Sequence, residues 1–140
     1  MRVAIGCDHV GVPLKRLLIA SVLSTHDVLD MGTHTEESVD YPDIARAVAA
    51  EVAAGAVERG ILICGTGIGM AMAAGKVPGI RAATCGDTFS AEMSRRHNQA
   101  NVLCLGARAI GSGLAKRIAM TWLSTGFDGG RHERRVGKIE

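Results

Sequence analysis

A cysteine followed directly by a glycine-rich segment is the most informative chemical feature of the sequence. Cys64 ends the apolar run 60–64, and Gly65-Thr66-Gly67-Ile68-Gly69 follows it. Glycines in such a turn let backbone N–H groups approach an anion, and a helix that begins there adds its dipole. The same position can lower a thiol pKa and so create a base or nucleophile. Two simpler interpretations stay open: a plain strand-to-helix turn, and a buried thiol that only fills space.

The spacing of these glycines excludes two familiar phosphate-binding loops. The segment has neither the G-x-G-x-x-G pattern of dinucleotide sites nor the G-K-[ST] ending of a P-loop. The chain is also short for a full dinucleotide site. We therefore expect a small anionic ligand rather than a nucleotide cofactor.

Further titratable residues are candidates for acid–base work or anion binding. Asp8 and His9 follow the first apolar run, and His97 lies near the end of a predicted helix. A histidine there can be a general acid or base, or only a partner of the helix dipole. Arg131 and Arg135 are four residues apart, so on a helical turn they share a face and suit a phosphate. A solvated basic tail is the alternative.

Composition excludes several classes of protein. The 140 residues carry a net charge of +2 and four aromatic side chains, so there is no electrostatic footprint or stacking platform for nucleic acid. No apolar run is long enough to span a membrane. The four cysteines are widely spaced without a C-x-x-C pair, which favours free thiols in a reducing cytoplasm over a disulfide scaffold or a zinc site.

Short apolar runs alternate with helical patterns along the whole chain. We predict strands at 3–6, 28–30, 60–64, 80–85 and 102–105, each followed by a helix. This alternation predicts one domain, residues 1–140, with an α/β fold: a three-layer α/β/α sandwich around a Rossmann-like, five-stranded parallel sheet. Ligands bind at the carboxyl ends of such strands. We expect Asp8, His9, Cys64, His97-Asn98 and Arg108 to converge on that edge.

The order of six short motifs resembles the ribose/galactose phosphate isomerase family over nearly the whole chain. The motifs are Gly6-Cys7-Asp8-His9, Asp40-Tyr41-Pro42, the Cys64 segment with its glycines, Arg96-His97-Asn98, Gly106-Ala107-Arg108, and Gly129-Gly130-Arg131-His132 with Arg135. Some members of the family replace the cysteine by serine and use a glutamate just after the glycines. Met70 occupies that region here, so the chain resembles the cysteine type.

The resemblance implies an aldose–ketose isomerase of carbohydrate metabolism that needs no metal or cofactor. It implies interconversion of D-ribose 5-phosphate and D-ribulose 5-phosphate through a cis-enediolate. Cys64 would be the base, His97 would open the sugar ring, and Thr66 would assist proton handling. The implied substrate contacts are Asp8, Tyr41, Gly65, Gly67, Ile68, Gly69 and Asn98 for the sugar or enediolate, and His9, Arg108, Arg131 and Arg135 for the phosphate.

The resemblance also implies an active site shared between subunits, in a homodimer or a tetramer. Some relatives divide the cysteine loop and the histidine–arginine set between different polypeptides, whereas this chain carries both sets. Gly75 stands where members tend to have asparagine before the lysine, and its effect on substrate choice stays open. Two other functions also remain: the same reaction on another phosphosugar such as allose 6-phosphate, and a non-catalytic phosphosugar-binding module.

Overall fold

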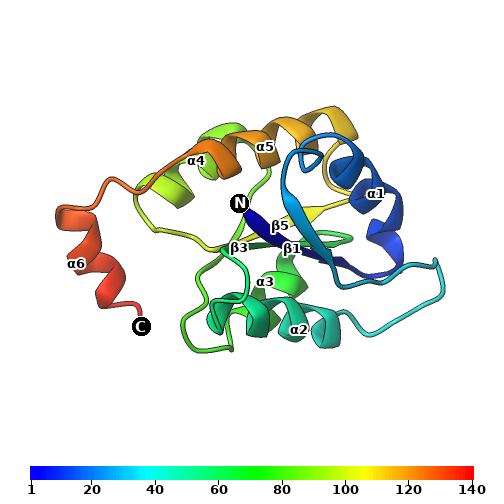
Figure 1. Cartoon of the computed structure of the whole chain (residues 1–140), viewed down its shortest axis with the longest axis horizontal. Coiled ribbons are helices and arrows are strands. Elements are labelled where there is room, and N and C mark those ends of the chain that lie inside the picture. Colours follow the sequence, from blue (N-terminus) through cyan, green and yellow to red (C-terminus); the bar gives the residue numbers. More distant parts are fainter.

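A parallel sheet of five strands forms the centre of the protein in the computed structural model, which describes residues 1–140 (Figure 1). The strands are β1 (Arg2–Cys7), β2 (Asp27–Asp30), β3 (Arg59–Cys64), β4 (Ala82–Thr84) and β5 (Val102–Gly106). Their order across the sheet is β2-β1-β3-β5-β4, and every neighbouring pair is parallel. The predicted fold class is therefore confirmed.

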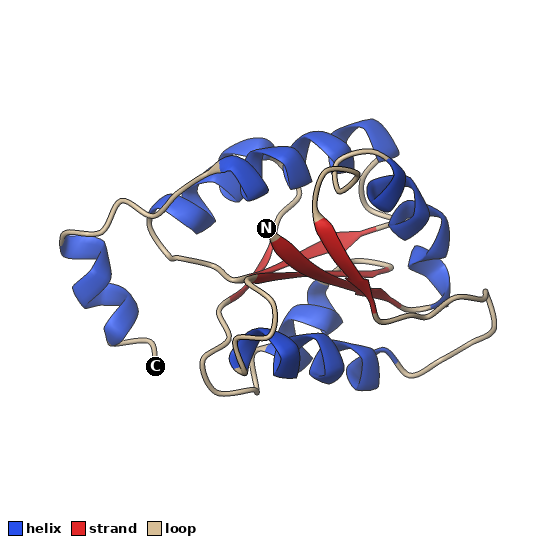
Figure 2. Ribbon diagram, in the orientation of Figure 1, coloured by secondary structure: helices blue, strands red, loops and turns tan.

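Helices cover both faces of the sheet and complete the three layers (Figure 2). They are the 3₁₀ helix η1 (His9–Gly11) and the α-helices α1 (Val12–Ala20), α2 (Tyr41–Ala53), α3 (Ile68–Ala74), α4 (Thr88–Arg96), α5 (Ser112–Ser124) and α6 (Arg131–Gly137). No helix combines the length and the apolar character needed to cross a membrane.

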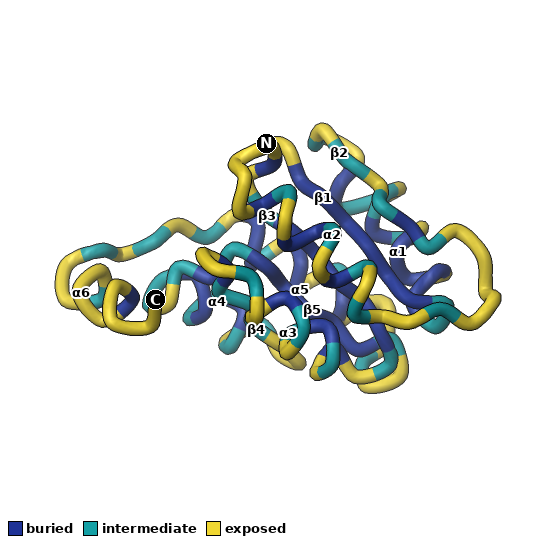
Figure 3. Tube along the Cα trace, turned by 90° about the horizontal axis from the view of Figure 1, so that it is seen from below, coloured by how far each residue is buried: buried dark blue, intermediate teal, exposed yellow.

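Side chains of the central strands point alternately to the two faces of the sheet, which divides the hydrophobic core into two parts. Ile61 and Ile63 of β3 pack with the side chains of α1, α4 and α5, including the fully buried Trp122. Leu62 and Cys64 point to the other face, where α2 and α3 pack. Since successive strand residues face opposite sides, one apolar run fills both halves of the core. Figure 3 shows β1, β3 and β5 as buried, whereas α6 is mostly exposed.

Two elements differ from the sequence prediction, and a third was left open. Helix α3 begins at Ile68, within the segment expected to be a glycine-rich turn, because Gly67 turns the chain with φ +81° and the helix follows at once. Strand β4 is shorter than the predicted 80–85, since a loop side chain, Asn101 Oδ1, binds the amide of Arg81. Residues 131–137, which the sequence left open between a helical turn and a solvated basic tail, form helix α6 after a turn at two glycines with positive φ.

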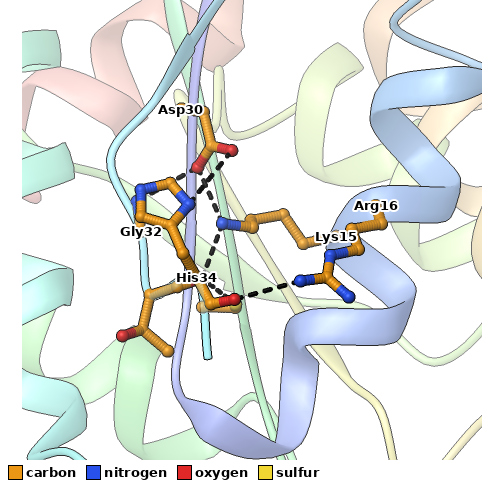
Figure 4. A network of polar contacts seen from close by, with 7 residues as sticks. Lys15, Arg16, Asp30, Gly32 and His34 are labelled. Atoms are coloured by element: carbon orange, nitrogen blue, oxygen red, sulfur yellow. Dashed lines mark hydrogen bonds and ion pairs between the residues drawn. The ribbon is translucent and has the colours of Figure 1, made fainter. Parts of the chain in front are cut away.

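A buried lysine fixes the segment that follows β2 (Figure 4). Lys15 Nζ donates to Asp30 Oδ1 at 2.7 Å and to the carbonyl of Thr33 at 2.6 Å. The amide of Gly32 also donates to Asp30 Oδ1, at 3.1 Å. Partial burial would raise the pKa of Asp30, but the hydrogen bonds from Lys15 and Gly32 outweigh it and hold that pKa below its usual range.

This network supports the carboxyl end of β1. The amide of Cys7 donates to the carbonyl of Gly32 at 2.7 Å, and the amide of Thr33 donates to the carbonyl of Cys7 at 2.8 Å. Arg16 adds a bond to the carbonyl of His34 at 3.0 Å. Helix α1 and the segment after β2 therefore clamp the strand end from which Asp8 and His9 extend.

Candidate active site

A cavity of about 250 Å³ opens at the carboxyl ends of β1 and β3. Its lining consists of Asp8, Tyr41, Cys64, Gly65, Thr66 and Gly69. All six are among the residues that the sequence predicted for the site. They come from three separate stretches of the chain, which the parallel sheet brings together at one edge.

The thiol of Cys64 is the candidate reactive group of this cavity. Cys64 is the last residue of β3 and is 6% exposed. Its Sγ accepts a hydrogen bond from the amide of Gly67 at 3.1 Å. The geometry therefore suits a base or nucleophile.

The glycine loop is held against β5 by its own backbone. A Cβ on Gly67 would lie 3.0 Å from the carbonyl carbon of Leu105, and one on Gly106 would lie 2.7 Å from the carbonyl oxygen of Thr66. The amide of Arg108 donates to the carbonyl of Gly65 at 3.0 Å. Close backbone packing thus requires glycine at both positions and gives the loop amides a fixed direction.

Tyr41 and Asp8 form the wall opposite the loop. Tyr41 begins α2, and its ring lies so close to Gly69 that a Cβ there would be 2.5 Å from the ring. Asp8 Oδ1 accepts from the amides of Val10 and Gly11 at 3.0 and 3.3 Å, which caps η1. Asp8 Oδ2 makes no hydrogen bond within the chain. That oxygen is the one available to a ligand hydroxyl.

His9 and Arg108 flank the cavity without lining it. His9 Nδ1 accepts from the amide of Val39 at 3.3 Å, so its ring proton lies on Nε2. The exposed Arg108 passes over Gly65, where a Cβ would lie 3.7 Å from Arg108 Cδ. Both side chains can therefore present an N–H to an anion beside the cavity.

The other three cysteines do not line this cavity, and none of them accepts a hydrogen bond from a loop amide. Burial raises the pKa of Cys7 to about 11, and burial also raises the pKa of Cys85. Cys104 is fully buried within β5, and burial raises its pKa as well. All four thiols are free. Cys7, Cys64 and Cys85 all lie at or just after the ends of strands, so position in the sequence does not select Cys64. The hydrogen bond from the amide of Gly67 does select it.

A second polar cluster gathers around His97, the C-cap of α4. Its ring stacks on His132 with the centroids 4.1 Å apart and the planes 8° apart. Asp128 Oδ2 lies 3.9 Å from His97 Nε2, and Arg96 Nε donates to both oxygens of Asp128 at 3.2 Å. The hydrogen bond from Arg96 holds the pKa of Asp128 below its usual range. His132 belongs to the motif at residues 129–132, but the sequence predicted no function for it, and Asp128 was not predicted as a site residue.

The donor atoms of His97, Asp128 and His132 lie within 4.8 Å of one another, so these residues could meet at one metal ion. The positive charges around these three residues disfavour the binding of a metal cation. Arg96 already occupies both carboxylate oxygens of Asp128. Partial burial lowers the pKa of His132, and the positive charges of His97 and the α6 arginines lower it further. The cluster is therefore better suited to an anion than to a divalent cation.

The expectation that His97 and Asn98 share an edge with Cys64 within one chain is wrong. Helix α4 returns antiparallel to the strands, so its end at His97 lies just before the start of β5 at Val102. Asn98 lines a different cavity, of about 370 Å³. Arg131 and Arg135 do share a helix, α6, but Figure 1 shows α6 standing away from the sheet. One chain therefore presents two separate halves of the predicted site.

Comparisons with known proteins agree with this set of residues. A model of the family described as Ribose/Galactose Isomerase matches residues 3–139. The chain is 48% identical over 139 residues to ribose-5-phosphate isomerase B of Escherichia coli, covering 99% of this chain and 93% of that protein. It is 44% identical over 141 residues to the D-erythrulose-4-phosphate isomerase of Pectobacterium atrosepticum, with coverage of 99% and 93%.

Solved structures agree in fold as well as in sequence. Ribose-5-phosphate isomerase B of Clostridium thermocellum superimposes with a TM-score of 0.96 at 55% identity, covering 99% of this chain and 95% of that one. The Mycoplasma genitalium enzyme of the same name, solved with bound ribulose-5-phosphate, gives a TM-score of 0.94 at 39% identity, with coverage of 99% and 93%. The strand-end cysteine, its glycine loop and these near-complete matches together show that the chain belongs to the ribose/galactose isomerase family.

Proposed function

We propose that the protein interconverts D-ribose 5-phosphate and D-ribulose 5-phosphate. The observation that carries this proposal is the Cys64 thiol, hydrogen-bonded by the amide of Gly67 inside a cavity that Asp8 and Tyr41 close. The names of the relatives and the ribulose-5-phosphate complex of one of them support the choice of sugar. A free thiol at this position also fits a reducing cytoplasm, where pentose phosphates are processed.

The chemistry follows from the position of the thiolate. Cys64 removes the proton from C2 of the open-chain aldose, and the C–H electrons form the C1–C2 double bond while the carbonyl electrons move to O1. The amides of the 65–69 loop stabilise the resulting cis-enediolate. Cys64 then returns the proton to C1, and the 2-hydroxyl proton passes to O1 with the help of Thr66, which gives the ketose. No step requires a metal or a cofactor, and we expect full activity after dialysis against a chelator.

We further propose that a second copy of the chain completes each site. His97 would open the furanose ring, Asn98 would bind the sugar, and Arg131 and Arg135 would hold the phosphate. The separation of these residues from Cys64 within one chain supports a homodimer or a tetramer of such dimers. Mixing inactive Cys64→Ala and His97→Asn proteins after dissociation should restore part of the activity. No recovery in verified mixed dimers would contradict shared sites.

Another phosphosugar is the alternative substrate. A relative named for a four-carbon sugar phosphate shows that members of this family differ in substrate. Allose 6-phosphate and similar hexose phosphates place the phosphate one carbon further from C1. A panel of kcat/KM values for four-, five- and six-carbon aldose phosphates tests the choice. Ribose 5-phosphate should rank first, and a ranking far below another sugar would contradict the proposed substrate.

A further inference from the structure

A second polar cavity, of about 300 Å³, lies at the opposite edge of the sheet from Cys64. Its lining consists of Val52, Glu58, Arg59, Arg81, Arg95, Gln99 and Asn101, so only one residue is apolar. Arg59 begins β3, Arg81 precedes β4 and Asn101 precedes β5. None of these residues belongs to the proposed active site. This arginine cavity is therefore a separate feature of the fold.

Two of its guanidinium groups lack a carboxylate partner. No carboxylate lies within 4.0 Å of Arg59 or Arg95, and Arg95 is only 8% exposed. Burial lowers the pKa of Arg95 to about 10, with a further decrease from the charges of Arg59 and Arg81. Buried charges in proteins are normally paired. The cavity thus carries an excess of positive charge that an anion would neutralise.

Backbone carbonyls hold these guanidinium groups in fixed directions. Arg59 Nη1 donates to the carbonyls of Trp122 and Leu123 at 2.8 and 2.9 Å. Arg95 Nη1 donates to the carbonyl of Ala100 at 2.6 Å. Both guanidinium carbons also lie over the Trp122 ring, 5.4 and 5.9 Å from its centroid. A ligand would meet preorganised donors, which lowers the entropic cost of binding.

Each arginine keeps its Nη2 atom free, and Arg59 keeps its Nε free as well. The Nη2 atoms of Arg59, Arg81 and Arg95 make no hydrogen bond within the chain. None of the three is a fully buried atom without a partner, so each reaches the solvent. Arg81 Nη1 already binds an oxyanion of the chain itself, the Glu140 carboxylate, at 2.6 Å. The cavity therefore offers free N–H donors, and the pair with Glu140 outside its lining shows that Arg81 can bind an oxyanion.

We propose that the arginine cavity is a binding site for a small phosphorylated anion. Three guanidinium groups match the several oxygens of a phosphoryl group better than they match a single carboxylate. The volume of about 300 Å³ is at the lower end of small-ligand sites. Glu58 at the rim and Glu140 at the chain end compete with such a ligand. This site does not depend on the proposed isomerase activity.

Inorganic pyrophosphate is a suitable probe, and isothermal titration calorimetry at fixed ionic strength is the measurement. The titration uses the variant Arg131→Gln/Arg135→Gln, which lacks two of the four proposed phosphate contacts of the active site and so weakens any competing binding there. We expect one pyrophosphate per chain. Adding Arg59→Gln should weaken binding at least tenfold, whereas Arg117→Gln, at an exposed arginine of α5, should leave it unchanged.

Two variants keep the test decisive if Arg59→Gln fails to fold. Glu58→Gln and Glu140→Gln remove exposed competing carboxylates without touching the core, and each should strengthen binding by threefold or more. Absence of pyrophosphate binding in the Arg131/Arg135 background would overturn the proposal. Binding that none of the three cavity variants changes would overturn it too, and the arginines would then only cap the end of α5.

Discussion

The amide of Gly67 donates a hydrogen bond to the sulfur of Cys64 across 3.1 Å, although the two residues belong to different elements. Cys64 ends β3, and Gly67 precedes α3 with a φ of +81°. A left-handed residue at this point turns the chain back so that its N–H meets the thiol. In the proposed reaction, the amides of this loop would therefore contact both the Cys64 sulfur and the oxygen of the enediolate.

Substitution of Gly69 should disturb Tyr41 while leaving the fold intact. Gly69 lies in α3, where alanine is favoured by the backbone, but the added Cβ would be 2.5 Å from the Tyr41 ring. We expect Gly69→Ala to lower kcat/KM by about 10- to 100-fold, because the ring must leave its place in the cavity wall. Steady-state kinetics and a thermal melt of the same protein check this.

Two controls separate this clash from a general effect of alanine. Gly113 of α5 has open space around its Cβ position, so Gly113→Ala should leave activity unchanged and stabilise the fold by about 0.5–1 kcal/mol. The double variant Gly69→Ala/Tyr41→Ser removes the clash between the added Cβ and Tyr41, but it also removes the aromatic ring from the cavity wall. If Gly69→Ala were fully active, Tyr41 would not form a wall of the substrate site.

The alternation of apolar runs and helical patterns was sufficient to predict the sheet. A run such as Ile61-Leu62-Ile63 is apolar on both faces, which only a central parallel strand accommodates. The start of α3 was missed because it depends on the φ of Gly67, a backbone property that spacing does not report. Helix α6 stayed open between a helical turn and a solvated tail because seven residues with one buried apolar side chain, Val136, show no periodicity.

The candidate site was predictable only in part. Cys64, Asp8 and the loop follow strand ends, and strand direction alone places them at one edge. His97 ends a helix rather than a strand, so it lies at the other edge. Only the family resemblance indicated that a second chain would unite the two halves. The stack with His132 depends on the turn at Gly129 and Gly130, both of which have positive φ.

Loss of the Asp30 carboxylate should destabilise the fold because it leaves the buried ammonium of Lys15 without an anionic partner. The Lys15 side chain is 2% exposed, and Asp30 is its one carboxylate. We expect Asp30→Asn to lower the free energy of unfolding by about 2–3 kcal/mol, measured by urea denaturation. Asp27→Asn is the control, since its pair with Arg2 is exposed and should cost less than about 1 kcal/mol.

The stabilisation of the fold by the Lys15–Asp30 pair should depend on pH, in a direction that the lowered pKa of Asp30 determines. The pKa of Asp30 is lower in the folded protein than the ordinary value of 3.8. The stabilisation is therefore complete above pH 3.8 and is lost as the pH falls through the folded pKa. The two unfolding curves should converge in acid. A constant difference between wild type and Asp30→Asn down to the lowest accessible pH would be inconsistent with this pair.

The His97–His132 stack should weaken in mild acid. The pKa of His132 is lower in the folded protein than its ordinary value of 6.5, so the unfolded chain binds more protons in this range. Stability should fall as the pH drops below 6.5. His132→Phe keeps an aromatic ring on His97 but cannot ionise, so its melting temperature should fall less. Equal slopes for the two proteins between pH 7 and the folded pKa would refute this link.

Alkylation should distinguish Cys64 from the other three thiols. Cys64 faces the cavity, whereas burial raises the pKa values of Cys7, Cys85 and Cys104. Iodoacetamide at neutral pH should modify Cys64 first, and loss of activity should parallel that single modification in a peptide map. Cys64→Ser should resist labelling under the same conditions. Faster labelling of Cys85 would show that burial does not control reactivity here.

Isomerisation of ribose 5-phosphate in D₂O by wild type and Cys64→Ala is the most direct test of the proposed function. The wild type should incorporate solvent deuterium at C1 of the ketose, because a thiol exchanges its proton with solvent during the transfer. Cys64→Ala should lose turnover and exchange by about 10²–10⁴-fold while still binding the sugar phosphate. Cys85→Ala should behave like the wild type. Undiminished turnover and deuterium incorporation in Cys64→Ala would show that Cys64 is not the base.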